Sequence, residues 1–266
     1  MHPIERLRYV ARADGAEPAV LVRETALALC GMEFDPQSLV LACRRIVERH
    51  PTTAQLWWLC AHVLTASEPF ARARELARAA EHDDTAQHLD DALPDDARVV
   101  IVGWPNTAVK CLAQRGDATL FVVDSHGEGE ALVDRLHHAD ISAELVPGEC
   151  AAAAVAQCDA VVVEALAAGA GAVLAVGASR GVVDTARALG KPVLLVAPLG
   201  TRLPDVLWNG MLAALGVPGD WRAGLDVVEV SRFTRVVGPH GATDDASSAL
   251  APECPPAGEL LRRSAI

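Results

Sequence analysis

Two patterns of hydrophobic residues divide the 266-residue chain near residue 95. In the first part, apolar residues recur at helical spacing, and new helices are expected after Pro51 and over residues 69–81. One such stripe lies in residues 35–50 and consists of Leu39, Ala42, Cys43, Ile46 and Val47. The spacing predicts a small helical N-terminal domain over residues 1–92.

From residue 97, short apolar runs alternate with helical stretches. The runs predict strands at 98–102, 119–123, 142–146, 160–164 and 193–197, and residues 173–190 are expected to be helical. Strands that alternate with helices form β-α-β units, so the fold class is α/β with a Rossmann-like parallel sheet. The carboxyl ends of parallel strands share one edge, which is where ligands bind in such folds.

The boundaries of the remaining segments follow from composition. Residues 81–96 are acidic and end in a proline turn, which favours a solvated connector. The Rossmann-like domain is predicted over residues 97–237. Residues 238–266 are rich in Pro, Ser, Ala and Gly, and we expect them to form a loosely packed C-terminal arm.

Charge and cysteine content exclude several classes of function. The formal net charge of −12 argues against nucleic acid as a partner, because a phosphate backbone needs a basic surface. The longest uncharged run, residues 165–179, is too short and too weakly hydrophobic to cross a membrane. Seven cysteines without a CxxC pair, in a chain without a secretory signal pattern, are expected to be reduced thiols in a cytoplasmic protein.

Glu164 is the strongest candidate for chemistry. It ends an apolar strand at the ligand-binding edge, where burial would raise its pKa, as expected of a general acid or base. Capping of a neighbouring helix, or pairing with an arginine, is an equally good interpretation. Asp124 and Ser125 follow another strand, and they can either bind a sugar hydroxyl or cap the next helix.

The glycine-rich stretch 169–177 does not predict a dinucleotide site. The third glycine of a GxGxxG motif would fall at Leu174, so these glycines are expected to permit close backbone packing or a flexible loop. No metal-binding pattern is present, and neither a metal nor a cofactor is predicted.

Residues 97–204 resemble the family of the translation initiation factor 2B alpha, beta and delta subunits. That family includes the isomerases of methylthioribose-1-phosphate and ribose-1,5-bisphosphate. VVIVGWPNTA resembles the isomerase strand and turn I-L-T-H-C-N-T-G, and FVVDS resembles the next strand. CDAVVVEALAAGAGAVLAVGAS resembles D-x-V-I-V-G-A-D-x-V-x-A-N-G-D-x-x-N-K-x-G-T, and KPVLLVAP resembles K-x-P-F-Y-V-A-A-P. The resemblance implies a helical domain followed by a Rossmann-like domain.

This chain departs from the isomerases at their reacting groups. Pro105 stands where the resemblance places the catalytic Cys, and Pro cannot transfer a proton. Glu164 aligns with the catalytic Asp, while Leu174 and Ala175 replace an Asn-Lys pair. The arginine that follows the acid of the second strand is absent, because His126 stands near that position.

Two functions follow from these observations. The first is a non-catalytic initiation-factor-2B-like protein that binds a small ligand, such as a sugar phosphate or nucleotide, or a protein partner. The alternative is an aldose–ketose isomerase, an intramolecular oxidoreductase, that uses Glu164 as acid and base. The regulatory subunits of the factor also lack the Cys, which favours the first.

The sequence also predicts the lining of a ligand pocket and the assembly of the chain. A ligand pocket at the strand edge should be lined by Gly103, Asn106, Thr107, Asp124, Ser125 and Glu164. The two carboxylates in that set favour a neutral or hydroxyl-rich ligand over a bisphosphate. The resemblance implies a homodimer formed through the Rossmann-like domain, and the Ala/Gly-rich stretch 165–178 can let two backbones approach closely.

Overall fold

A computed structural model of the chain describes residues 17–31, 36–218 and 220–262. The start of the predicted helical domain and the segment searched for a secretory signal, residues 1–16, lie outside the described residues. Five helices come first: α2 (Pro18–Cys30), α3 (Pro36–Arg49), α4 (Ala54–Thr65), α5 (Pro69–Glu81) and α6 (Thr85–Ala92). None of the helices in the described part of the chain is long and apolar enough to cross a membrane.

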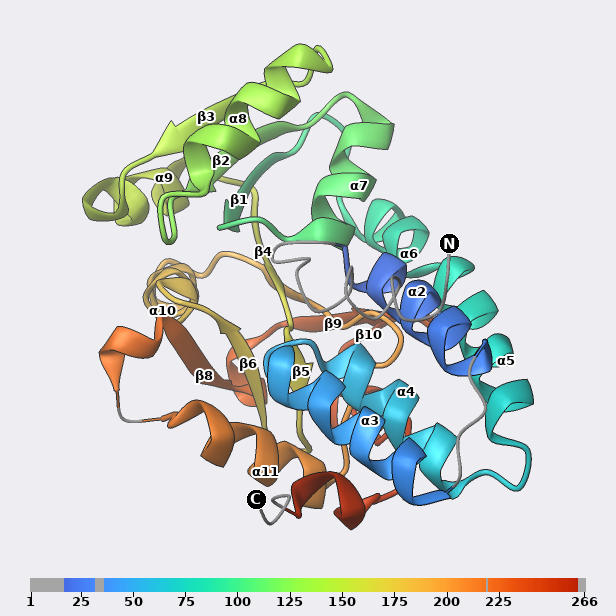
Figure 1. The fold of residues 1–266 in the computed structure, drawn as a ribbon. Helices are drawn as coiled ribbons and strands as arrows, with labels where there is room; N and C mark the ends of the chain where they lie inside the picture. Colours follow the sequence, from blue (N-terminus) through green and yellow to red (C-terminus); the bar gives the residue numbers. More distant parts are fainter. Residues whose placement is uncertain (1–16, 32–35, 219, 263–266) are drawn as a thin grey trace.

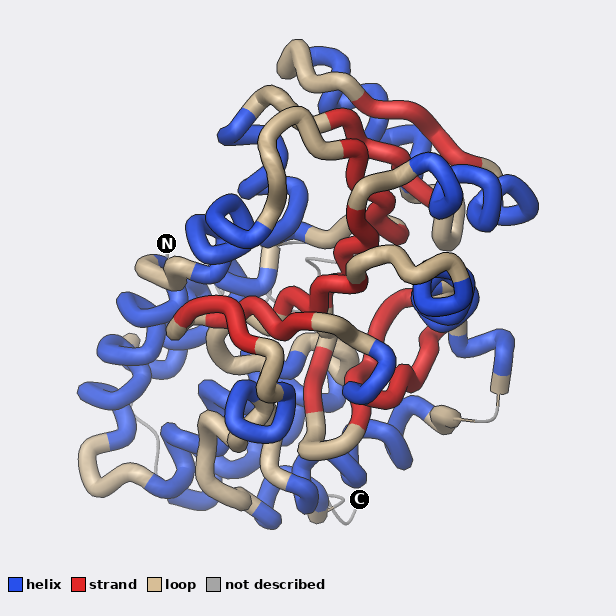
Figure 2. Tube along the Cα trace, turned by 180° about the vertical axis from the view of Figure 1, so that it is seen from behind, coloured by secondary structure: helices blue, strands red, loops and turns tan. Residues whose placement is uncertain are grey.

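A seven-stranded sheet follows and runs through the centre of the molecule (Figures 1 and 2). Its strands, in spatial order, are β10 (Gly241–Thr243), β9 (Arg235–Gly238), β7 (Val193–Val196), β4 (Ala160–Glu164), β1 (Arg98–Val102), β2 (Thr119–Val123) and β3 (Ala143–Val146). All neighbours pair in parallel except β9 and β10. The α/β fold class and the five predicted strands are confirmed, with ends that differ by at most one residue.

Helices cover both faces of this sheet. On one face lie α6, α7 (Asn106–Arg115) and α8 (Gly129–His138); on the other lie α9 (Ala151–Gln157) and α10 (Ser179–Ala188). Successive side chains of β1 lie on opposite faces of the sheet. Val99 and Ile101 pack with α7, while Val100 and Val102 pack toward α9 and α10. A strand buried on both faces reads as an unbroken apolar run, which is why its position could be predicted.

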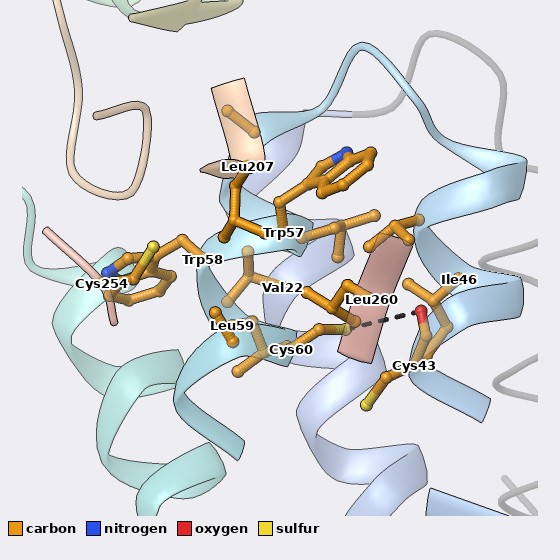
Figure 3. Close-up of a cluster of buried hydrophobic side chains, with 14 of the residues drawn as sticks. Val22, Cys43, Ile46, Trp57, Trp58, Leu59, Cys60, Leu207, Cys254 and Leu260 are labelled. Atoms are coloured by element: carbon orange, nitrogen blue, oxygen red, sulfur yellow. Dashed lines mark hydrogen bonds between the residues drawn. The ribbon is translucent and has the colours of Figure 1, made fainter. Parts of the chain in front are cut away.

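The first four helices share a third core with distant parts of the chain. Figure 3 shows Trp57 and Cys60 of α4 packed with Val22 of α2, Leu207 of α11 (Asp205–Leu215) and Leu260 near the C-terminus. The helical segment α2–α5 is therefore not an isolated bundle, because it packs on α11 and on the C-terminal part of the chain. The domain limits at residues 92, 97 and 237 remain a prediction.

Three local predictions were wrong. Residues 85–92 form helix α6 rather than a solvated connector, because Leu89 is fully buried and the Asp83 carboxylate accepts hydrogen bonds from the Thr85 amide and hydroxyl. The C-terminal arm is not loosely packed, since Leu250, Ala257 and Leu260 are buried.

The third correction concerns residues 173–190, where only α10 is helical. Residues Ala172–Val176 form strand β6, the centre of a second sheet with the antiparallel neighbours β5 (Ala167–Ala168) and β8 (Leu225–Glu229). The glycines of this stretch do permit close packing: a Cβ at Gly169 would lie 2.8 Å from the Trp208 ring.

Candidate functional site

The site lies where the strand order of the main sheet reverses direction. From β1 the chain runs outward through β2 and β3, and then returns to the other side of β1 to form β4. The crevice at the carboxyl ends of two such strands is open to a ligand, because their following connections diverge to opposite faces. Here those ends are the turn after β1, residues 103–105, and Glu164 at the end of β4.

Glu164 is bonded to the first turn of α7. Its Oε2 accepts the amide of Thr107 at 2.8 Å and the amide of Ala108 at 3.0 Å. These two N–H groups have no partner within the helix, and the positive end of the helix dipole also favours a carboxylate there. Helix capping, one of the two interpretations of Glu164, is thus what the hydrogen bonds show.

The environment of Glu164 nevertheless disfavours its charge. Burial raises its pKa from the ordinary value of 4.5 to about 7, and the nearby Asp83 carboxylate acts in the same direction. The bonds from Thr107 and Ala108 lower the pKa but do not compensate. The direction is the one expected from the sequence, and it leaves the carboxyl able to exchange a proton near neutral pH.

The turn before α7 brings Asn106 and Thr107 beside Glu164, as predicted, and the three residues line a common cavity. Gly103 adopts a φ of +62°, in the left-handed region, and packs against Val176 rather than lining this cavity. Pro105 is buried where the resemblance places the isomerase Cys. The turn offers no side chain that can take a proton from a bound ligand.

The other two predicted ligand-binding residues are engaged in structural bonds. Asp124 Oδ1 accepts the amide of Gly129 at 2.9 Å, which caps the start of α8. Ser125 is buried, and its hydroxyl donates to the carbonyl of Gly177 at 3.0 Å. The Asp124 bond closes the loop after β2, and the Ser125 bond holds this loop against the residue that follows β6 of the second sheet.

Two cavities meet at Glu164. The large cleft has a volume of about 630 Å³ and lies between the helical segment and the turn after β1; the small cavity, of about 200 Å³, lies toward α5 and α6. Glu164 and Asn106 line both, as do Pro18 and Gln55. A volume in the range of ordinary small-molecule sites makes the large cleft the better candidate.

Side chains that sequence reasoning missed bring cationic groups to the large cleft, beside Glu128 and Glu164. Arg49 ends α3, His50 follows it in the connection to α4, and Arg135 comes from α8. The Arg135 guanidinium lies over the Trp104 ring, 5.6 Å from its centroid, and it forms no ion pair with a described residue. The polar turn before Pro51 was a signal for the first two residues, whereas an arginine in the last turn of α8 carries none.

Comparison with solved structures identifies the fold. The Pyrococcus horikoshii OT3 translation initiation factor eIF-2B superposes with a TM-score of 0.72, at 15% sequence identity, over 91% of this chain and 97% of that chain. The chain has the initiation factor 2B fold. The tetrameric eIF2B-beta2-delta2 complex from C. thermophilum matches with a TM-score of 0.72 at 13% identity, covering 93% of this chain and 91% of that chain.

An isomerase shares this fold as well. The 5-methylthioribose 1-phosphate isomerase from Pyrococcus horikoshii OT3 superposes with a TM-score of 0.67 at 13% identity, over 93% of this chain and 86% of that chain. The resemblance noted in the sequence is therefore confirmed for the fold. By sequence alone the chain matches no family model, and it matches no curated protein with significance.

Proposed function

We propose that this chain is a non-catalytic, initiation-factor-2B-like protein that binds a small phosphorylated ligand in the large cleft. The observation that carries the proposal is the make-up of the cleft: the guanidinium groups of Arg49 and Arg135 line it together with His50, while Pro105 occupies the turn where a reacting side chain would stand. The cleft can therefore bind an anion, but one wall lacks the group that proton transfer would need.

The ligand class follows from the charges and the size of the cleft. A guanidinium binds phosphate through paired hydrogen bonds, and Arg135 is held with its guanidinium over Trp104. Asn106 and Glu164 offer hydrogen bonds to hydroxyl groups at the strand end. This combination supports a sugar phosphate or a nucleotide with one phosphorylated end, in place of the neutral ligand favoured by the sequence alone.

A thermal-shift screen of sugar monophosphates and nucleoside monophosphates tests the proposal. We expect binders to raise the melting temperature by an amount that grows with the logarithm of one plus the ratio of ligand concentration to Kd. The Arg135→Ala variant should lose most of this shift, whereas Arg187→Ala, at an exposed arginine on α10 outside the cleft, should keep it. The same shift in both variants, or no shift with any phosphorylated compound, would contradict the proposal.

One observation favours the alternative, an aldose–ketose isomerase. With a pKa of about 7, Glu164 can both accept and return a proton at neutral pH. Incubation with methylthioribose 1-phosphate separates the two functions. An enzyme would form the ketose product and lose this activity in Glu164→Gln; the non-catalytic protein would form no product.

We also propose a homodimer, formed through the Rossmann-like domain as the resemblance implies, and a cytoplasmic location. The solved complex of the same fold from C. thermophilum is tetrameric, which supports assembly of several chains. Light scattering that gives the mass of a dimer would support this assembly, and a monomer at high protein concentration would count against it.

A further inference from the structure

The hydrogen bonds of Glu164 distinguish its two oxygens. Both amide bonds from α7 end on Oε2, at 2.8 and 3.0 Å. An oxygen that accepts two N–H groups is a poor place for a proton, so a protonated Glu164 carries its hydrogen on Oε1. The Thr107 hydroxyl is the other donor near this carboxyl. Since a carboxyl group has about four lone-pair positions, Oε1 keeps the capacity for a further hydrogen bond, and Glu164 lines the large cleft.

The charges around Glu164 do not fix it in the ionised form. None of the described cations forms an ion pair with it, and Asp83 and burial both raise its pKa. The charged and titratable groups that line the two cavities come from the start of α2 (Glu17, Arg23), the end of α3 and the residue after it (Arg49, His50), the α5–α6 region (Glu81, Asp83), α7 (Lys110) and α8 (Glu128, Arg135).

We propose that Glu164 binds the ligand as a neutral carboxylic acid, with Oε1–H donating to a ligand oxygen, so that binding of a phosphorylated ligand takes up a proton. This inference rests on the proposed function. A phosphate in the same cleft adds negative charge, and the ligand displaces water from the carboxyl; both changes disfavour the carboxylate. The bound state therefore holds more protons than the free state, and affinity falls as pH rises above neutral.

Isothermal titration with ribose 5-phosphate as the probe tests this directly. Titrations at pH 7 in two buffers of different ionisation enthalpy give the number of protons exchanged on binding. We expect the wild type to take up about 0.5 proton more than Glu164→Gln, because Glu164 is about half protonated in the free protein at that pH. Subtracting the number of protons taken up by Glu164→Gln removes the protons that the phosphate of the probe itself exchanges. An equal exchange in the two proteins, or a release by Glu164, would overturn the inference.

The pH dependence of affinity provides a second measurement. Glutamine can accept the α7 amides through its oxygen and donate to the ligand through its nitrogen, so it mimics the neutral acid. We expect the ratio of Kd in the wild type to Kd in Glu164→Gln to rise from about 1 at pH 6 to roughly 10 at pH 8. Weaker binding by Glu164→Gln than by the wild type at pH 8 would show that the carboxylate is the bound form.

His50 also lines the cleft, and its side chain can contribute to the pH dependence of binding. The His50→Gln variant identifies its contribution. The ratio of Kd in His50→Gln to Kd in the double variant His50→Gln/Glu164→Gln should still rise with pH. A ratio that does not change with pH would assign the proton uptake to His50 instead. Failure of ribose 5-phosphate and of every other compound of the thermal-shift screen to bind the wild type or Glu164→Gln at any pH would overturn the proposed function itself. Binding without the proton uptake would overturn only this inference.

Discussion

Replacing Glu164 with glutamine is expected to stabilise the free protein above pH 7. The pKa of Glu164 is raised from 4.5 to about 7 in the folded protein, so the folded state holds more protons than the unfolded state between these two pH values. The free energy of unfolding of the wild type therefore falls as pH rises through this window. A shift of this size corresponds to about 3 kcal/mol when Glu164 is ionised in both states.

Glutamine removes the charge and keeps an oxygen that can accept the Thr107 and Ala108 amides. We expect the stability of Glu164→Gln relative to the wild type to increase by about 2–3 kcal/mol between pH 5 and pH 8. Urea unfolding followed by tryptophan fluorescence measures this difference. The control is Glu149→Gln, which removes one charge from an exposed residue before α9 and should show no such pH dependence.

A decrease in the stability of Glu164→Gln at pH 8 would refute the reasoning. It would mean that the carboxylate, bonded to the start of α7, stabilises the helix by more than its burial costs. The same data would then argue against a neutral Glu164 in the bound state. The unfolding experiment thus tests the electrostatics of the site without any ligand.

Three further predictions follow from local geometry. Ala178 adopts a φ of +74°, so Ala178→Gly should raise the free energy of unfolding by about 0.5–1 kcal/mol in urea titrations, and a loss of stability would contradict this. Gly169→Ala would place a Cβ 2.8 Å from the Trp208 ring and should lower stability by about 1–3 kcal/mol, whereas Gly171→Ala, with no atom within 4 Å, should change it little; equal effects would be inconsistent with the close packing. Pro105→Cys should not create isomerase activity on methylthioribose 1-phosphate, because Leu174 and Ala175 also replace the polar pair of the isomerases, and turnover by this variant would disprove that.

The main sheet could be predicted from sequence because its strands are buried on both faces. Val99–Val102 and Val161–Val163 are unbroken branched runs, a pattern typical of strands covered by helices on two sides. Strand β6 was missed because its residues Ala172–Val176 are flanked by alanines, which favour helices, and by glycines, which do not indicate a strand. Helix α6 was missed because its acidic residues mask the few apolar positions, such as Leu89, that dock it on the sheet.

Only those residues of the site that stand at the ends of strands could be predicted from the sequence. Asn106 and Thr107 follow one strand and Glu164 ends its neighbour, so parallel topology alone brings them together. Arg135 reaches the cleft from the last turn of a helix, and His50 reaches it from the helical segment. Their position in the cleft depends on how the helices pack against the sheet, and no local sequence pattern predicts that packing.

The absence of catalysis in a cleft that binds phosphorylated ligands is the central claim. It is tested most directly by a proton NMR time course of the unmodified protein with methylthioribose 1-phosphate. The account predicts that the ligand resonances broaden through binding and that no ketose product forms. Formation of the ketose at a rate above that of the protein-free sample would contradict it.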